Sequence, residues 1–75
     1  MKNKYETKFK EIFCMIMGTT EVDESWVMNE LAEWDSLKHV QLLSELEDEL
    51  NLSLDYEDIL SMTSIRKIDD VLCKY

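Results

Sequence analysis

Proline is absent from this chain of 75 residues, and Gly18 is its only glycine. Hairpins and β-sandwiches need such turn-forming residues at short intervals, so this composition argues against both. Histidine and cysteine are also scarce, because His39 is the only histidine and Cys14 and Cys73 stand far apart, without the spacing of a zinc site. We expect both thiols to be reduced and buried, with no disulfide framework and no metal.

Basic residues are few, because 8 lysines and arginines face 17 aspartates and glutamates, for a formal net charge of −9. A surface of this charge repels nucleic acid and anionic membranes and favours partners with basic patches. No apolar run approaches the roughly 20 residues of a membrane-spanning helix, and the opening MKNKYETKFK has no apolar signal-peptide core. We therefore expect a cytoplasmic, monomeric protein with no membrane span and no nucleic-acid partner.

The first third of the chain has the apolar spacing of a helix. Its apolar stripe consists of Tyr5, Phe9, Ile12, Phe13 and Ile16. Asn3 and Glu6 have the spacing of a capping box at the start of this helix, and Gly18 is suited to end it in a left-handed conformation. Residues Thr19–Glu33 lack a sustained period and predict a long loop whose large apolar residues fold back onto the core.

A second helix is predicted over Ser36–Leu50, closed by Asn51. Its inward stripe consists of Val40, Leu43, Leu46 and Leu50. The opposite, exposed face consists of Leu37, Gln41, Ser44 and Asp48. His39 is expected to be half-buried at the edge of the inward stripe.

Two shorter helices complete the prediction. Tyr56–Ser61 has room for one or two turns, and Thr63 or Ser64 caps a last helix whose inward residues are Ile65, Ile68, Val71 and Leu72. The predicted fold is all-α, a single domain over residues 1–75 built as a small four-helix bundle with three main helices, one short helix and a long first loop. Its expected core residues are Phe9, Phe13, Leu43, Leu46, Ile65 and Ile68. Four methionines, at positions 15, 17, 28 and 62, are expected to pack in the core or against the loop.

The stretch EWDSLKHVQLL raises a question of function, because Ser36 stands at the mouth of the second helix. Helix physics alone favours a plain cap, made either by Ser36 or by Asp35. A catalytic role for Ser36 lacks a positioned base and the Gly-x-Ser-x-Gly turn. The acidic stretch LDYEDIL lacks the glycine and the bidentate glutamate of an EF-hand. A phosphodiester on Ser36 would be favoured by the positive end of the helix dipole.

The stretch DSLKHVQLLSELEDEL resembles the modification site of the acyl carrier protein family. In that family Asp-Ser-Leu opens the second helix, and the serine receives 4′-phosphopantetheine from coenzyme A. The resemblance extends over nearly the whole chain, from the first amphipathic helix to the last helix opened by Thr63-Ser64. The form WDSL looks most like free-standing carriers of specialised pathways and thiolation-type carriers.

This resemblance implies a carrier and not an enzyme. A phosphopantetheinyl transferase would load Ser36, and the terminal thiol of the arm would hold an acyl or aminoacyl group as a thioester for partner enzymes. Those partners would dock on the second helix. The implied contact residues are Asp35, Leu37, Lys38, Gln41, Ser44, Glu45, Glu47 and Asp48.

Three residues depart from the pattern of the fatty-acid carriers that the sequence resembles. Lys38 and His39 stand where those carriers have acidic or small residues, and Gln41 is neutral where a glutamate is common. We interpret these differences as favouring a dedicated set of partners: an adenylate-forming acyl or aminoacyl ligase with an acyltransferase, ketosynthase or other enzyme of one biosynthetic pathway. The alternatives are a general fatty-acid carrier and, from another class, a non-covalent acidic adaptor for a basic protein. The cargo is left open.

Overall fold

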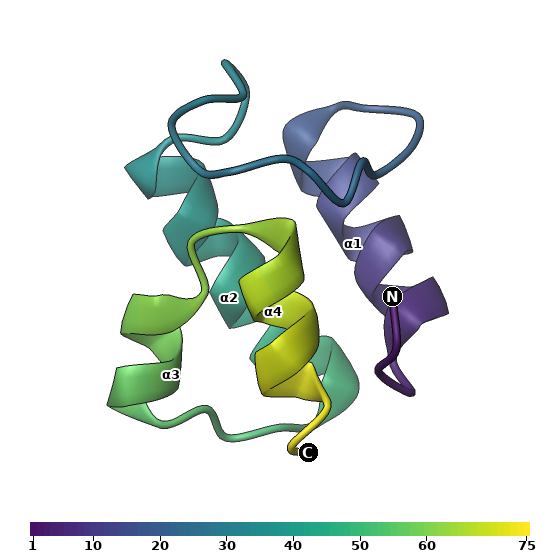
Figure 1. Cartoon of the computed structure of the whole chain (residues 1–75), viewed down its shortest axis with the longest axis vertical. Coiled ribbons are helices and arrows are strands. Elements are labelled where there is room, and N and C mark those ends of the chain that lie inside the picture. The colour runs from purple at the N-terminus through teal and green to yellow at the C-terminus, as the bar shows by residue number, and fades with distance from the viewer.

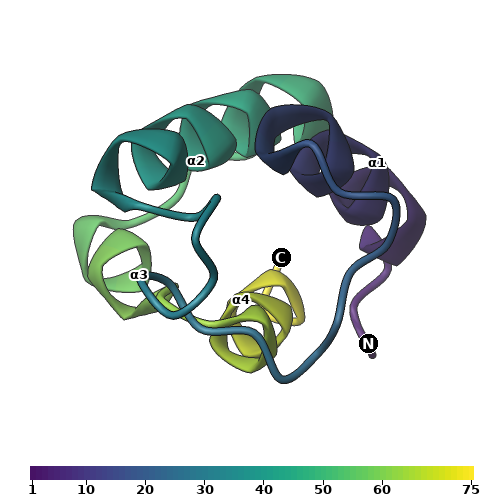
Figure 2. The same cartoon turned by 90° about the horizontal axis from the view of Figure 1, so that it is seen from above.

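The computed structural model describes all 75 residues and contains four helices and no strand (Figure 1). The helices are α1 (Glu6–Met17), α2 (Ser36–Leu50), α3 (Tyr56–Ser61) and α4 (Ile65–Leu72). Helices α1 and α2 pack along each other, and α3 packs against α4. Seen from above, the helices surround a common interior, and the loop between α1 and α2 runs around its edge past α4 (Figure 2). This arrangement confirms the predicted all-α fold. No helix is both long and apolar enough to cross a membrane.

The core contains all six residues that were expected to form it, and it also takes side chains from outside the helical stripes, whereas the stripe residues Tyr5, Ile16 and Leu50 are only half-buried. The largest addition is Trp34, which precedes α2 and is fully buried. Its indole meets the ring of Phe13 edge-on, with centroids 5.3 Å apart and planes at 88°. Burying one large apolar side chain contributes roughly 1.5–3 kcal/mol. The loop therefore stabilises the fold as well as connecting α1 to α2.

The loop from Thr19 to Asp35 is held in place by hydrogen bonds to the start of α4. The Met28 N–H donates to the Thr63 carbonyl at 2.8 Å, and the Ile65 N–H donates to the Trp26 carbonyl at 3.0 Å. The ring of Trp26 stacks on Phe13, with centroids 6.0 Å apart. These contacts confirm that the loop's large residues fold back onto the core.

Local capping signals determine where most of the helices begin and end. Gly18, at φ 74°, and Asn51, at φ 54°, end α1 and α2 in the left-handed conformation, as predicted. At α4, the Ser64 hydroxyl accepts a hydrogen bond from the Lys67 N–H, so Ser64 and not Thr63 is the cap.

The start of α1 does not have the predicted capping box. Tyr5 stands at the cap position without a side-chain cap bond, and Glu6 pairs with Lys10 one turn later. Asn3 is buried instead, where its Oδ1 accepts a hydrogen bond from the Tyr5 N–H and its Nδ2 donates to Asp69 on α4. The local pattern misses this arrangement because Asp69 lies 66 residues away in sequence.

The inward stripe of α2 is also shifted from the prediction. Val40 is 65% exposed, whereas Leu42 is fully buried and His39 is buried with it. Residues three and four positions before Leu43, which are Val40 and His39, can both share its face of the helix. In the structure His39 faces inward, because Trp34 provides a buried hydrogen-bond partner for its ring.

Two further expectations on burial are wrong. Cys14 is only half-buried and Cys73 is exposed, although both thiols are free as expected. Met15 is 68% exposed. It lies outside the α1 stripe, because Ile12 and Phe13 turn the adjoining face of the helix inward.

Candidate functional site

Ser36 is the first residue of α2, and its side chain is exposed. The cap is Asp35, whose Oδ1 accepts a hydrogen bond from the Lys38 N–H at 2.9 Å. This resolves the alternative that the sequence left open between Asp35 and Ser36. Because Asp35 supplies the capping oxygen, the Ser36 hydroxyl is not used by the fold. It lies at the positive end of a helix of 15 residues, where N–H groups of the first turn lack helical acceptors.

A buried hydrogen bond links the residues on either side of this turn. The Trp34 Nε1–H donates to Nδ1 of His39 at 3.1 Å, and both side chains are buried. Burial lowers the pKa of His39 below its ordinary value, and a weaker opposing effect comes from the Ile59 carbonyl on α3. The prediction of a half-buried His39 was therefore wrong. A ring that is buried and engaged in this way is not a general base for Ser36.

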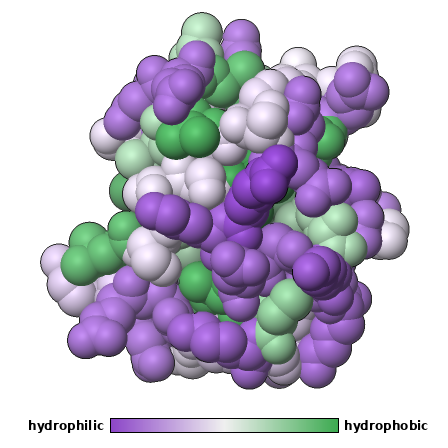
Figure 3. Space-filling view, viewed as in Figure 1, coloured by the Kyte–Doolittle hydropathy of each residue, from purple (hydrophilic) through white to green (hydrophobic).

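The exposed face of α2 agrees with the prediction. The residues on it are Leu37, Gln41, Ser44 and Asp48, all exposed. Leu37 is 73% exposed and directly follows Ser36, and Val40 adds a second exposed apolar side chain one turn along. The molecular surface in Figure 3 is largely hydrophilic, with small, separate hydrophobic patches. Ser36 therefore has two exposed apolar side chains beside it on an acidic molecule.

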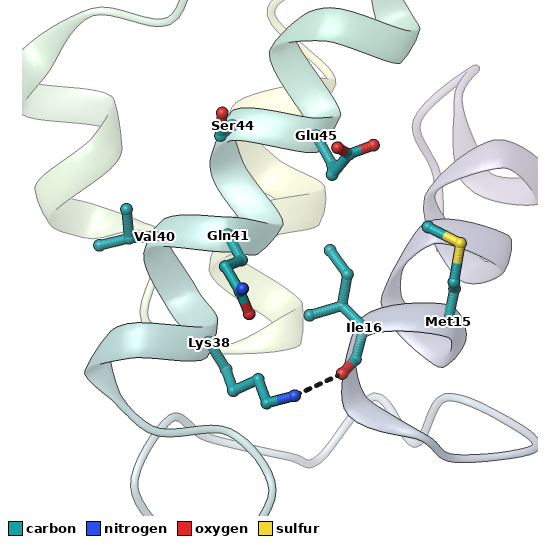
Figure 4. Close-up of a pocket in the computed structure, with 7 residues that line it drawn as sticks. All are labelled: Met15, Ile16, Lys38, Val40, Gln41, Ser44 and Glu45. Carbon is teal, nitrogen blue, oxygen red and sulfur yellow. Dashed lines mark hydrogen bonds between the residues drawn. The ribbon is translucent and has the colours of Figure 1, made fainter.

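Lys38 is directed toward α1. Its Nζ donates to the carbonyl oxygen of Ile16 at 3.1 Å, as the dashed line in Figure 4 shows. This contact is at one end of a groove between α1 and α2. The residues that line the groove are Met15, Ile16, Lys38, Val40, Gln41, Ser44 and Glu45. The Lys38 ammonium thus interacts with the negative end of the α1 dipole.

The acidic residues of α2 differ in their contacts. Glu47 is half-buried, and its Oε2 accepts a hydrogen bond from the Leu54 N–H at 3.0 Å. Glu45 is half-buried beside the groove, and Asp48 is exposed. Glu47 therefore holds the segment after α2, while the exposed Asp48 carboxylate makes no such contact. No group of three or more histidine, cysteine, aspartate or glutamate side chains could hold a metal ion.

Sequence reasoning missed two further polar contacts of buried side chains. One is the pair of Trp34 and His39, whose separation of five residues across a helix start has no simple periodic signal. The other is Asp58 on α3, which accepts hydrogen bonds from Lys74 at 2.6 Å and from the Tyr75 hydroxyl at 2.8 Å. These two bonds hold the pKa of Asp58 below its ordinary value. They join the short α3 to the residues after α4.

Comparison with known proteins gives one informative relative. The acyl carrier protein of Buchnera aphidicola subsp. Baizongia pistaciae is 33% identical over 73 residues, which cover 93% of this chain and 92% of that protein. No protein-family model matches the chain. No solved structure matches it significantly.

Proposed function

The chain belongs to the acyl carrier protein family, and from this premise we propose that it carries an acyl or aminoacyl group as a thioester on 4′-phosphopantetheine attached to Ser36. Members of this family are not enzymes and work with partner enzymes. The observation that supports Ser36 most strongly is the capping of α2 by Asp35, which leaves the serine hydroxyl exposed and unused.

The environment of Ser36 suits a phosphodiester. Attachment joins the Ser36 Oγ to the phosphorus that bears the pantetheine, breaks the pyrophosphate of coenzyme A and releases adenosine 3′,5′-bisphosphate, while the hydroxyl proton leaves to the transferase. The product is an anion at the start of α2, where the helix dipole stabilises negative charge. When bound, the arm supplies a thiol whose thioester keeps the cargo carbonyl electrophilic.

The exposed face of α2 is the proposed docking surface for the transferase and the pathway enzymes. Leu37 and Val40 provide apolar contact, and Asp35 and Asp48 provide negative charge for basic patches on the partners. Gln41 and Ser44 lie on the same face, with Glu45 at the edge of the adjoining groove. The net charge of −9 favours fast, salt-sensitive encounters with basic partners.

We further propose a dedicated partner set for a cytoplasmic, monomeric carrier in a specialised biosynthetic pathway. Such a set would include an adenylate-forming ligase and an acyltransferase or ketosynthase. Two residues support this proposal less strongly than their sequence positions suggested, because Lys38 contacts Ile16 and His39 is buried. The support comes mainly from Gln41, which is exposed and leaves the middle of the docking face neutral.

Intact-mass measurement tests the attachment directly. Incubation with coenzyme A and a broad-specificity phosphopantetheinyl transferase is expected to add one phosphopantetheine to the protein. Ser36→Ala should abolish the gain, while Ser53→Ala, which changes an exposed serine in the segment between α2 and α3, should leave it unchanged. Circular dichroism checks that both variants keep their helices. A wild-type protein that stays unmodified with several such transferases would contradict the carrier function and favour a non-covalent adaptor.

A further inference from the structure

Trp34 and His39, which are joined by a hydrogen bond, lie on either side of the proposed attachment residue Ser36 in the sequence. The donor precedes Ser36 by two residues, the acceptor follows it by three, and Nε1 and Nδ1 lie 3.1 Å apart. The rings are adjacent, with centroids 5.8 Å apart and planes at 38°. The bond therefore connects the end of the long loop to the first turn of α2, with the exposed Ser36 between its two ends.

Trp34 is fixed independently of this bond. Its N–H donates to the Leu31 carbonyl at 3.0 Å, and its carbonyl accepts from the Asn29 N–H at 2.8 Å. Its indole is buried against Phe13 on α1. Trp34 is thus held firmly in the fold. Its hydrogen bond to His39 fixes the position of the first turn of α2 relative to the loop.

The bond requires a neutral imidazole. Tryptophan Nε1–H is only a donor, so Nδ1 of His39 must present its lone pair, and the proton of the neutral ring is on Nε2. Nε2 is buried and makes no hydrogen bond of good geometry. Protonation would put an N–H on Nδ1 that faces the Trp34 N–H. It would also create a buried positive charge in the first turns of α2, where the helix dipole disfavours cations.

No charged side chain stabilises the protonated form of His39. The titratable residues near His39 in sequence are Glu30, Glu33, Asp35, Lys38 and Glu45, and those of α3 are Tyr56, Glu57 and Asp58. None of them shifts the pKa of His39, which burial lowers and the Ile59 carbonyl partly restores. Asp35, Lys38 and Asp58 are each engaged elsewhere. Acidification below the ordinary histidine range therefore breaks the bond without offering a replacement.

We propose that Trp34 and His39 are positioning residues for Ser36, which hold the start of α2 in the orientation that the transferase recognises only while His39 is neutral. This inference rests on the proposed function. The first consequence is that the attachment reaction depends on a buried hydrogen-bond acceptor at position 39. The second is that the transfer of phosphopantetheine to Ser36 slows in acid because His39 of the carrier is protonated, and not only because of the transferase's own pH dependence.

Competition between variants tests the acceptor. Wild type and one variant are mixed in equal amounts with limiting transferase, and intact masses give the ratio of their kcat/KM values. His39→Asn, whose Oδ1 can replace Nδ1 as acceptor, is expected to stay within about twofold of wild type, and His39→Leu to be at least about fivefold slower. Trp34→Phe should behave like His39→Leu. Ile68→Val, a core change on α4, is the control for stability alone.

The pH profile separates positioning from a purely structural role. Because the competing proteins share one tube, the transferase's own pH dependence cancels from the ratio. The ratio of wild type to His39→Asn is expected to be constant at neutral pH and to fall, by up to about tenfold per pH unit, below the pKa of His39. A constant ratio across that pKa, or His39→Leu reacting as fast as His39→Asn, would overturn the proposal.

Nuclear magnetic resonance of the unmodified protein tests the same coupling without the transferase. The single histidine gives an unambiguous imidazole titration. The amide shifts of Ser36 and Leu37 are expected to follow it with the same midpoint, and to lose that titration in His39→Asn. Amide shifts that ignore the imidazole would overturn the positioning role. If the shifts follow the imidazole but no transferase modifies the wild type, the coupling stands and only the proposed carrier function fails.

Discussion

The Nζ atom of Lys38 lies 3.1 Å from the carbonyl oxygen of Ile16, so the first turn of α2 is fastened to the last turn of α1. Carbonyls in the last turn of a helix lack helical partners, and a cation there also favours the helix dipole. The residue that the sequence suggested as a partner contact thus has a structural interaction. Because Lys38 is directed toward α1, Leu37 and Gln41 are exposed residues beside Ser36 that remain available to a partner.

Removing this contact should weaken the fold modestly. Lys38→Met keeps most of the aliphatic stem and loses the ammonium, so we expect the free energy of unfolding to fall by about 0.5–1 kcal/mol in urea titrations. Lys67→Met, at an exposed position of α4, is the matched control and should be nearly neutral. Equal losses in the two variants would mean that the Ile16 contact contributes nothing.

Loss of the α2 cap should affect both stability and modification. Asp35→Ala removes the acceptor of the Lys38 N–H and should cost about 1 kcal/mol, whereas Asp35→Asn keeps a capping oxygen and should cost much less. Urea unfolding measures the stability of each variant, and the rate of phosphopantetheine transfer measures the effect on Ser36. If Asp35→Ala is as stable as Asp35→Asn, Asp35 is not the effective cap.

The buried carboxylate of Asp69 should be essential for joining the start of the chain to α4. It accepts hydrogen bonds from the Asn3 N–H and side chain and from the Lys2 N–H, at 2.6 to 3.0 Å. Asp69→Asn turns one acceptor oxygen into a donor, so we expect a loss of about 2 kcal/mol in the free energy of unfolding. Asp70→Asn, at the exposed neighbouring position, should change stability little. Similar midpoints for the two variants would contradict this role.

Stability should fall in acid. Hydrogen bonds from Lys74 and Tyr75 hold the pKa of Asp58 below its usual value. At Asp69 burial raises the pKa, but hydrogen bonds from Asn3 and Lys2 outweigh it and lower the pKa overall. Such acids bind fewer protons in the folded state. Their contribution is complete above the unfolded pKa of about 3.9, and it is lost as the pH falls through the folded values.

Urea midpoints between pH 7 and pH 2.5 check this dependence. The double variant Asp58→Asn with Asp69→Asn should start from a lower midpoint and decline less between pH 4 and the acid limit. A decline as steep as that of the wild type would show that other carboxylates carry the acid sensitivity.

The exposed leucine beside Ser36 should contribute to partner binding and not to stability. Leu37→Ala is expected to lower kcat/KM for phosphopantetheine transfer by about tenfold, equivalent to about 1.4 kcal/mol of lost contact. Leu60→Ala, at an exposed position of α3, is the matched control. An unchanged rate for Leu37→Ala would remove Leu37 from the docking surface.

Local signals in the sequence were sufficient for most of the fold. The bounds of α2 could be predicted because Asp35 and Asn51 act within one turn of the helix ends. Errors arose where a polar side chain found a distant buried partner, as Asn3 does with Asp69 and His39 with Trp34. A helical period allows position 39 or position 40 to face inward, and only the packing of the loop decides between them. For the same reason the motif could suggest Ser36 as the attachment site, whereas nothing in the sequence indicated the contact between Trp34 and His39.

The contact between Trp34 and His39 also gives the protein an internal optical reporter. A protonated imidazole quenches the emission of an adjacent indole far more strongly than a neutral one does. Trp26→Phe would leave Trp34 as the sole tryptophan, so its fluorescence would report the state of the α2 start during loading, in real time and without an added dye.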